Sequence, residues 1–161
     1  MVDKSLLQRQ VREQLAADLL QVEQALSAAH EAATHEENIA ENKYDTLGLE
    51  AAYLATGQAR RAEAIRQAMV HWRLFCPQPY SASKGIQLGA LVCLLGADEK
   101  QQLIFLGPEG GNMKLVIGAE SIQVISSQAP LGKALLGKAE GDEVMLEVAQ
   151  ARQQLEVLWV S

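Results

Sequence analysis

The chain has few aromatic residues, few cysteines and no long apolar run, and each shortage excludes a class of protein. Phe, Trp and Tyr make up 4% of its 161 residues, so one large aromatic-rich core is disfavoured relative to paired helices plus a small sheet. Cys76 and Cys93 lack CxxC spacing and offer neither a zinc site nor a disulfide framework. Because no apolar stretch approaches the roughly 20 residues that span a bilayer, and the first residues lack a signal peptide's apolar run, we expect a cytoplasmic protein without a membrane partner.

Basic residues are also fewer than acidic ones. The chain has 14 Lys and Arg against 20 Asp and Glu, a net charge of −6 and a pI near 5.1. A free-standing DNA-binding domain carries a basic face, so direct sequence-specific binding to nucleic acid is disfavoured as the main activity. An acidic protein can still serve a nucleic-acid machine by binding the machine's protein parts.

Proline is absent from Ser5 to Cys76, and the first prolines are Pro77 and Pro79. Proline removes a backbone donor and fixes φ, so a helix that ends near Phe75 must stop there. The sequence therefore predicts a helical domain over residues 1–76, a linker over 77–85, and a second domain over 86–161.

Two series of residues in the first domain follow heptad spacing. The first is Leu15, Leu19, Val22, Leu26, Ala29 and Ala33; the second is Tyr44, Leu47, Ala51, Leu54, Gln58, Arg61, Ile65, Ala68 and Trp72. Two such seams joined by a short polar link predict an antiparallel coiled-coil hairpin, with Asp3 or Ser5 as the cap of its first helix. Gly48 and Gly57 each cost this helix about 1 kcal/mol relative to alanine, which is tolerable if the partner helix packs close there.

The second domain shows short apolar runs separated by turn residues. The predicted strands are 86–95, 103–106, 113–116, 122–125, 144–148 and 155–160, with one short helix over 129–137 that begins near Pro130. The glycine-rich segment 107–112 is expected to be a hairpin turn. The predicted class is α+β: a helical hairpin followed by an antiparallel β domain with one short helix.

One segment of this domain resembles a family signature. The run from Ser127 to Lys138, SQAPLGKALLGK, followed by GDEV from Gly141, is similar to the C-terminal signature of the GreA/GreB transcription elongation factors. That resemblance implies an FKBP-like fold for residues 86–161 and docking on bacterial RNA polymerase. It further implies polymerase contacts by the signature residues Pro130, Leu131, Gly132 and Asp142.

The resemblance extends to the link between the two helices. Family members carry a tip motif of the form D-x-x-E-N-x-x-Y, and residues 38–44 here read NIAENKY, which places Asn38 where the family has its first acid. In the family the acidic tip enters the polymerase's secondary channel, where carboxylates help hold Mg²⁺ for phosphodiester hydrolysis. The resemblance thus implies that Glu41, with Glu37, acts in the polymerase's catalytic site.

Under this hypothesis the chain is an accessory factor and not an enzyme. It works as a monomer, with no metal or cofactor of its own apart from the polymerase's Mg²⁺. It stimulates cleavage of backtracked RNA; the alternative is a non-cleaving regulator that occupies the same channel and competes with other factors. A helical-hairpin adaptor unrelated to transcription is the third reading. His71 and Trp72 are expected to pack against the second domain.

Overall fold

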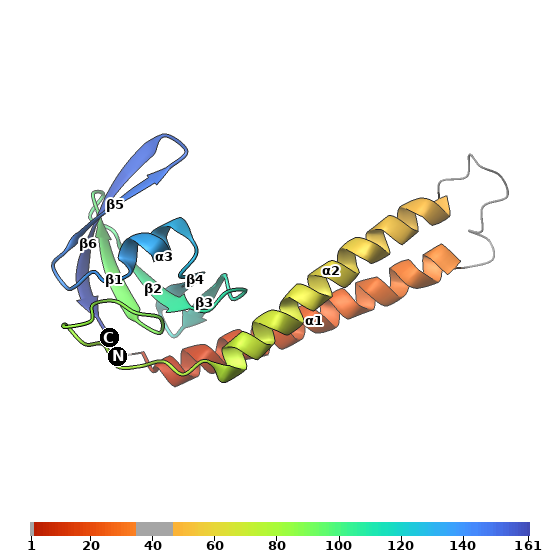
Figure 1. Ribbon diagram of the computed structural model, residues 1–161, viewed down its shortest axis with the longest axis horizontal. Coiled ribbons are helices and arrows are strands. Elements are labelled where there is room, and N and C mark those ends of the chain that lie inside the picture. The colour runs from red at the N-terminus through yellow and green to blue at the C-terminus, as the bar shows by residue number, and fades with distance from the viewer. Residues whose placement is uncertain (1, 35–46) are drawn as a thin grey trace. The chain divides into compact units, whose positions relative to one another are not determined.

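Two helices, a six-stranded sheet and one further short helix make up the fold (Figure 1). The computed structural model describes residues 2–34 and 47–161. Its elements are α1 (Lys4–Thr34), α2 (Leu47–Leu74), β1 (Leu91–Gly96), β2 (Gln101–Gly107), β3 (Met113–Ile117), β4 (Glu120–Ser126), α3 (Pro130–Leu135), β5 (Glu143–Val148) and β6 (Ala151–Val160). This arrangement confirms the predicted fold class.

Packing divides the chain into two compact units. One comprises residues 1–12 and 70–161, and the other comprises residues 13–69. The predicted boundaries at 76 and 85 follow the change from helix to strand. The packing units instead assign the first turns of α1 and the last turn of α2 to the same unit as the sheet.

Helix α1 begins at an aspartate cap. Asp3 Oδ1 accepts hydrogen bonds from the Ser5 amide, at 2.8 Å, and from the Ser5 hydroxyl, at 2.7 Å. The hydroxyl bond, followed by the amide bond, lowers the pKa of Asp3 below its usual value, because both favour the ionised carboxylate. Of the two caps that the sequence allows, the structure therefore assigns Asp3.

The helical seam in the unit formed by residues 13–69 agrees with prediction on α1 and departs from it on α2. Leu15, Val22 and Ala29 are buried as expected. On α2 the predicted seam residues Leu54 and Arg61 are exposed, and their neighbours Ala55 and Ala62 are buried instead, at 5% and 0% exposure. Residues 51, 55, 58, 62 and 65, of which 55 and 62 are buried and the others half-buried, keep alternating steps of four and three. Alanine fits this seam because small side chains let two helices approach closely.

The partner helix does not pack close at Gly57, so that condition is not met there. A Cβ built on Gly57 meets no atom within 4 Å, so this glycine lies on an open face of α2. Across the seam, Arg66 Nη2 contacts Glu23 Oε1 at 2.9 Å. Both side chains are nearly half exposed, so the ion pair contributes at most about 1 kcal/mol. Gly48 lies in α2, and packing around it falls outside what the structure describes.

The sheet has the strand order β3-β4-β2-β1-β6-β5. Strands β2 and β4 pair in parallel, and the other neighbouring strands pair antiparallel. The segment 107–112 is therefore not the predicted hairpin turn: it leads from β2 to the edge strand β3, and β4 returns to lie between them. Burial explains this order, because Ile122 and Val124 of β4 are fully buried while Val116 of β3 is 66% exposed.

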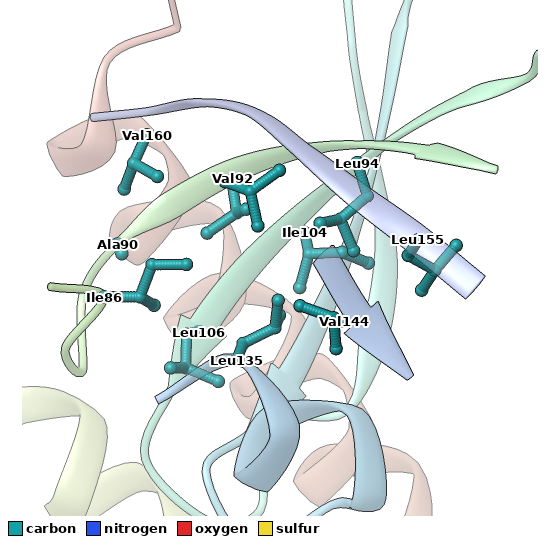
Figure 2. Close-up of a cluster of buried hydrophobic side chains, with 11 residues drawn as sticks. Ile86, Ala90, Val92, Leu94, Ile104, Leu106, Leu135, Val144, Leu155 and Val160 are labelled. Carbon is teal, nitrogen blue, oxygen red and sulfur yellow. The ribbon is translucent and has the colours of Figure 1, made fainter. Parts of the chain in front are cut away.

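One face of the sheet forms the main apolar core with α3 (Figure 2). Its fully buried members include Val92, Leu94, Ile104, Leu106 and Leu135. Burial of each such side chain contributes about 1.5–3 kcal/mol. The opposite face is also buried at its centre, since Leu91 pairs with Phe105 and Phe105 with Val124, all at 0% exposure. Burial on both faces accounts for the continuous apolar run in β1.

The strand predicted from residue 86 begins only at Leu91. Gly89 has φ +95°, which interrupts the extended conformation. Ile86 instead pairs with the chain that follows α3: its amide donates to Lys138 O at 2.8 Å, and its carbonyl accepts from the Gly137 amide at 2.9 Å. The segment 86–90 thus anchors the linker to the core.

Strands β5 and β6 form a hairpin whose outer half extends past β1. Residues 155–160 of β6 pair with β1, whereas Ala151 to Gln154 pair with β5 alone. Its two-residue turn has φ of 51° at Ala149 and 68° at Gln150, and positive φ at both positions is the pattern of a type I′ turn. Neither residue type favours the left-handed region, which costs non-glycine residues about 1–2 kcal/mol each.

We predict that the double variant Ala149→Asn, Gln150→Gly stabilises the protein by about 1 kcal/mol, because Asn-Gly suits a type I′ turn. Urea unfolding should show a higher midpoint with an unchanged slope. An unchanged or lower midpoint would contradict the strain assigned to this turn. Gln153→Gly, on the same exposed strand but outside the turn, is the control and should destabilise.

Candidate functional site

The candidate catalytic residues of the sequence lie outside the described residues. Glu37, Asn38 and Glu41 belong to the segment 35–46, which joins the end of α1 to the start of α2. By composition this segment holds Glu36, Glu37, Glu41 and Asp45 against a single Lys43.

The helix ends on either side of that segment add exposed carboxylates. Glu31 lies exposed in the last turns of α1, and Glu50 lies exposed in the first turn of α2. A carboxylate in a first turn is favoured by the helix dipole, so Glu50 stabilises the start of α2. Within the described ranges 2–34 and 47–161, no three His, Cys, Asp or Glu side chains gather as metal ligands.

The four predicted polymerase-contacting residues surround α3 and the turn before β5. Pro130 is the first helical residue of α3 and is exposed, and Leu131 packs against the main core. Gly132 is buried, and a Cβ there would overlap the carbonyl oxygen of Ser126. Asp142 Oδ2 accepts a hydrogen bond from the Ala139 amide at 2.9 Å, which closes the turn. Of the four, Pro130 and Asp142 are the exposed ones, and their contact with a partner stays a prediction.

The glycines of the signature have separate structural roles. Gly141 has φ +84° and donates its amide to Val157 O at 2.8 Å. Gly137 has φ +78°, and its backbone contacts the position where a Cβ on Gly85 would stand. The signature is therefore in large part a folding motif, which explains how α3 is held on the sheet.

An aromatic cluster that includes Trp72 holds the end of α2. The Trp72 ring lies 5.7 Å from Phe75 and 6.2 Å from Phe105, centroid to centroid. A Cβ on Gly107 or on Gly111 would overlap the indole, so these two glycines form its seat. Trp72 therefore packs on the β domain as predicted, whereas its neighbour His71 is exposed and the prediction for it is wrong.

Two further details define this cluster. Gln8 Nε2 donates to the carbonyl oxygens of Trp72, at 2.9 Å, and Phe75, at 2.6 Å, so α1 satisfies orphan carbonyls at the end of α2. The indole nitrogen of Trp72 is buried and has no hydrogen-bond partner within the described chain. The sequence did not predict that Gly107 and Gly111 leave the space for the Trp72 ring. Two glycines close together after a buried strand were a signal that a large side chain packs there.

The buried cysteine is not a reactive group. Burial raises the pKa of the Cys93 thiol, and the nearby Glu120 carboxylate adds to that rise. Because the thiolate is the nucleophilic form, a raised pKa makes this thiol a poor nucleophile. No helix among the described residues is long and apolar enough to cross a membrane.

We predict that Gly107→Ala destabilises the protein by about 1–3 kcal/mol, because the added methyl overlaps the Trp72 ring. The matched control Gly57→Ala adds the same methyl in open space and should stabilise by up to about 1 kcal/mol. Both are measured by urea unfolding.

The double variant Gly107→Ala, Trp72→Phe tests whether the two residues act on each other. The smaller ring leaves room for the methyl and removes the unpartnered N–H, so the combined loss should be less than the sum of the single losses. Strict additivity would contradict the glycine seat.

Comparisons with known proteins point to one family. Residues 82–161 match the family model described as transcription elongation factor, GreA/GreB, C-terminal. Transcription elongation factor GreA of Desulfovibrio desulfuricans is 32% identical over 120 residues, which cover 73% of this chain and 69% of that protein. GreA of Desulfotalea psychrophila is 35% identical over 77 residues, 47% of this chain, and the match spans less than half, 44%, of that protein.

Solved structures give a weaker likeness. GreA factor homolog 1 of Thermus thermophilus is 20% identical, with 93% of this chain and 94% of that chain covered, at a TM-score of 0.40. A GreA/GreB factor from Nitrosomonas europaea is 16% identical, with 61% of this chain and 79% of that chain covered, at a TM-score of 0.39.

Proposed function

We propose, from the premise that this chain belongs to the GreA/GreB family of transcription elongation factors, that it binds bacterial RNA polymerase and stimulates cleavage of backtracked RNA. In this function it is an accessory factor, and the polymerase supplies the catalytic centre. The observation that carries the proposal is the combination of family membership with two long helices whose ends lead into the acidic segment 35–46.

Length supports the delivery of this segment into a channel. Helices α1 and α2 have 31 and 28 residues, so they are about 47 Å and about 42 Å long at 1.5 Å per residue. Their seam is built largely from alanine on α2, which keeps the helix pair thin. Two helices with a narrow seam, whose ends lead into an acidic segment, suit delivery of that segment into a narrow passage that leads to bound cations.

The roles proposed for the acidic residues follow from ligand chemistry. Carboxylate oxygens are hard ligands suited to Mg²⁺, whereas the Asn38 amide oxygen is neutral and weaker. We assign Glu41 as the principal carboxylate and Glu37, next to Asn38 in sequence, as the second. Mg²⁺ would belong to the polymerase and would supply water activation and charge stabilisation there. The chain contributes charge and position, and needs no cofactor of its own.

A second function is favoured by one residue. Asn38 stands where the family motif has an acid, and loss of that acid would weaken cation binding while leaving channel entry intact. The alternative is a non-cleaving regulator that binds the polymerase and excludes other factors.

A cleavage assay on a stalled, backtracked elongation complex separates the two. We expect the chain to shorten the RNA and Glu41→Ala to reduce the cleavage rate by about 10–100-fold, as for loss of a group that supports a metal. Glu31→Ala, an exposed carboxylate at the end of α1, is the matched control and should retain activity. Asn38→Asp should raise the rate.

The other outcomes of this assay contradict cleavage stimulation, polymerase binding or both. Polymerase binding with no shortening by the unaltered chain or by Asn38→Asp would overturn cleavage and support the non-cleaving regulator. Absence of polymerase binding would overturn both.

A further inference from the structure

The sheet face opposite α3 is buried under Trp72 at its centre and hollowed beyond it. Phe105 packs against the Trp72 ring there, and its neighbours Leu91 and Val124 are fully buried. Beyond them lies a depression of about 340 Å³, which we name the Trp159 depression. Its lining residues, from the four central strands, are Cys93, Gln101, Leu103, Glu120, Ser121 and Trp159.

Strand pairing arranges this part of the face in two rows that cross the sheet from β6 to β4. The first row, which is apolar, is Trp159, Cys93, Leu103 and Ile122. The second row lies two residues farther along each of β1, β2 and β4, and it is Glu156, Leu95, Gln101 and Glu120. An apolar floor therefore lies beside a row with a carboxylate at either end.

Trp159 and Glu120 form opposite walls of the depression. They belong to β6 and β4, and β1 and β2 lie between those strands. At about 4.8 Å per strand spacing, the two backbones are about 14 Å apart, and the two side chains occupy part of that width. Cys93 and Leu103 make the floor. Trp159 is 37% exposed, so part of its ring is open to a ligand.

Acidic charge on this side of the sheet is largely unpaired. Glu120 and Glu156 are exposed and make no ion pair within the described ranges. Among the strand residues of this face the one basic side chain is Arg152, which is paired with Glu147 at 2.8 Å. The turn 97–100, which joins β1 to β2, adds one lysine and two acids. The depression thus favours a cation.

The polar groups of the depression are hydrogen-bond acceptors. An ionised carboxylate such as that of Glu120 only accepts. Gln101 Oε1 accepts from the Cys93 thiol at 3.8 Å, a long contact from a weak donor, so this oxygen is available to a stronger one. Burial raises the pKa of the Cys93 thiol, and the Glu120 carboxylate adds to that rise, so the negative charge of Glu120 acts on the floor.

We propose that the Trp159 depression binds a small alkylguanidinium ligand, whose planar group stacks on Trp159 and donates hydrogen bonds to Glu120 and Gln101. A guanidinium has several N–H donors, no acceptor and a flat face that stacks on aromatic rings, whereas an ammonium is a compact, strongly hydrated point charge. The alkyl chain lies on Cys93 and Leu103. None of these residues has a part in the proposed function, so this inference goes beyond it and does not depend on it.

Other occupants fit this depression less well. Its volume is at the lower end of the range for small-molecule sites, about 300–1,000 Å³. A nucleotide or phosphate would meet the carboxylates of Glu120 and Glu156. A stable protein interface involves about 20–30 residues on each side, and six line this depression.

The test uses the two tryptophans of the chain as separate reporters. In the isotope-labelled full chain, each indole N–H gives its own magnetic-resonance signal, and Trp159→Phe assigns them. We expect n-butylguanidinium to shift the Trp159 signal saturably, with a dissociation constant of about 1–10 mM, and to leave the buried Trp72 signal unmoved. The neutral, similarly shaped n-butylurea should bind about tenfold more weakly or not at all.

Variants of exposed carboxylates separate a local contact from general attraction to an acidic protein. Glu120→Gln should weaken binding of n-butylguanidinium about fivefold, with an unchanged midpoint of urea unfolding. Glu143→Gln is the matched control: it removes the same charge from an exposed position on the same face, outside the depression, and should bind within about twofold of the unaltered chain. Trp159→Leu, followed by the Cys93 amide signal, should weaken binding about threefold.

Four results would overturn the inference. The first is an unmoved Trp159 signal at about 50 mM n-butylguanidinium. The second is equal binding of n-butylurea, which would show that the site selects the alkyl group. The third is equal weakening by Glu120→Gln and Glu143→Gln, which would reveal attraction without a site. The fourth is binding of a capped Gly-Arg-Gly peptide about tenfold more tightly than n-butylguanidinium, which would assign the depression to an arginine of a protein partner.

Discussion

The indole of Trp72 occupies the space that side chains at positions 107 and 111 would otherwise fill, and much of the surrounding structure depends on that fit. The ring contacts Phe75 beside it and Phe105 on the sheet. Phe105 lies on one of the two buried faces of β2. Because Gln8 also bonds the carbonyls of residues 72 and 75, the start of α1 and the end of α2 are held together at the same place. One large side chain thus packs the end of α2 against the sheet.

Burial of both faces of the sheet follows from this constraint. Phe105 must lie under Trp72, while its neighbours Ile104 and Leu106 point into the core with α3. A strand that is buried on both sides belongs in the middle of a sheet, and β2 lies between β1 and β4. The parallel pairing of β2 with β4 brings Ile122 and Val124 inside and leaves β3, which has one buried residue, at the edge.

The sequence predicts which segments are helices and strands better than it predicts which strands pair and which helix residues meet. Proline position correctly predicts the end of α2, and apolar runs correctly predict six strands and α3. The hairpin predicted at 107–112 is wrong because local turn residues carry no information about which strand returns beside β2. The seam of α2 is misplaced at Leu54 and Arg61 because the apolar Leu54 suggests a heptad register that continues to Arg61, whereas close helix approach favours the alanines at 55 and 62.

Prediction of the site divides in the same way. The signature at 130–142 is recognisable from sequence, but Gly132 and Gly141 prove to serve packing and turn geometry, which a motif alone does not distinguish from partner contact. The roles of Glu37 and Glu41 stay predictions, since they depend on ligand chemistry in a segment outside the described residues.

The alanine seam separates the residues of α2 that fold the helix pair from most of the exposed ones. Ala55, Ala62 and Ala68 are buried there, and the half-exposed Arg66 adds the ion pair to Glu23. The exposed positions of α2 carry apolar and charged side chains together, with Leu49 and Tyr53 beside Glu50 and Glu63. Gly57 also lies at an open position, where alanine would stabilise the helix by up to about 1 kcal/mol. Folding therefore restricts the seam to small residues and leaves the identity of the exposed residues to other constraints.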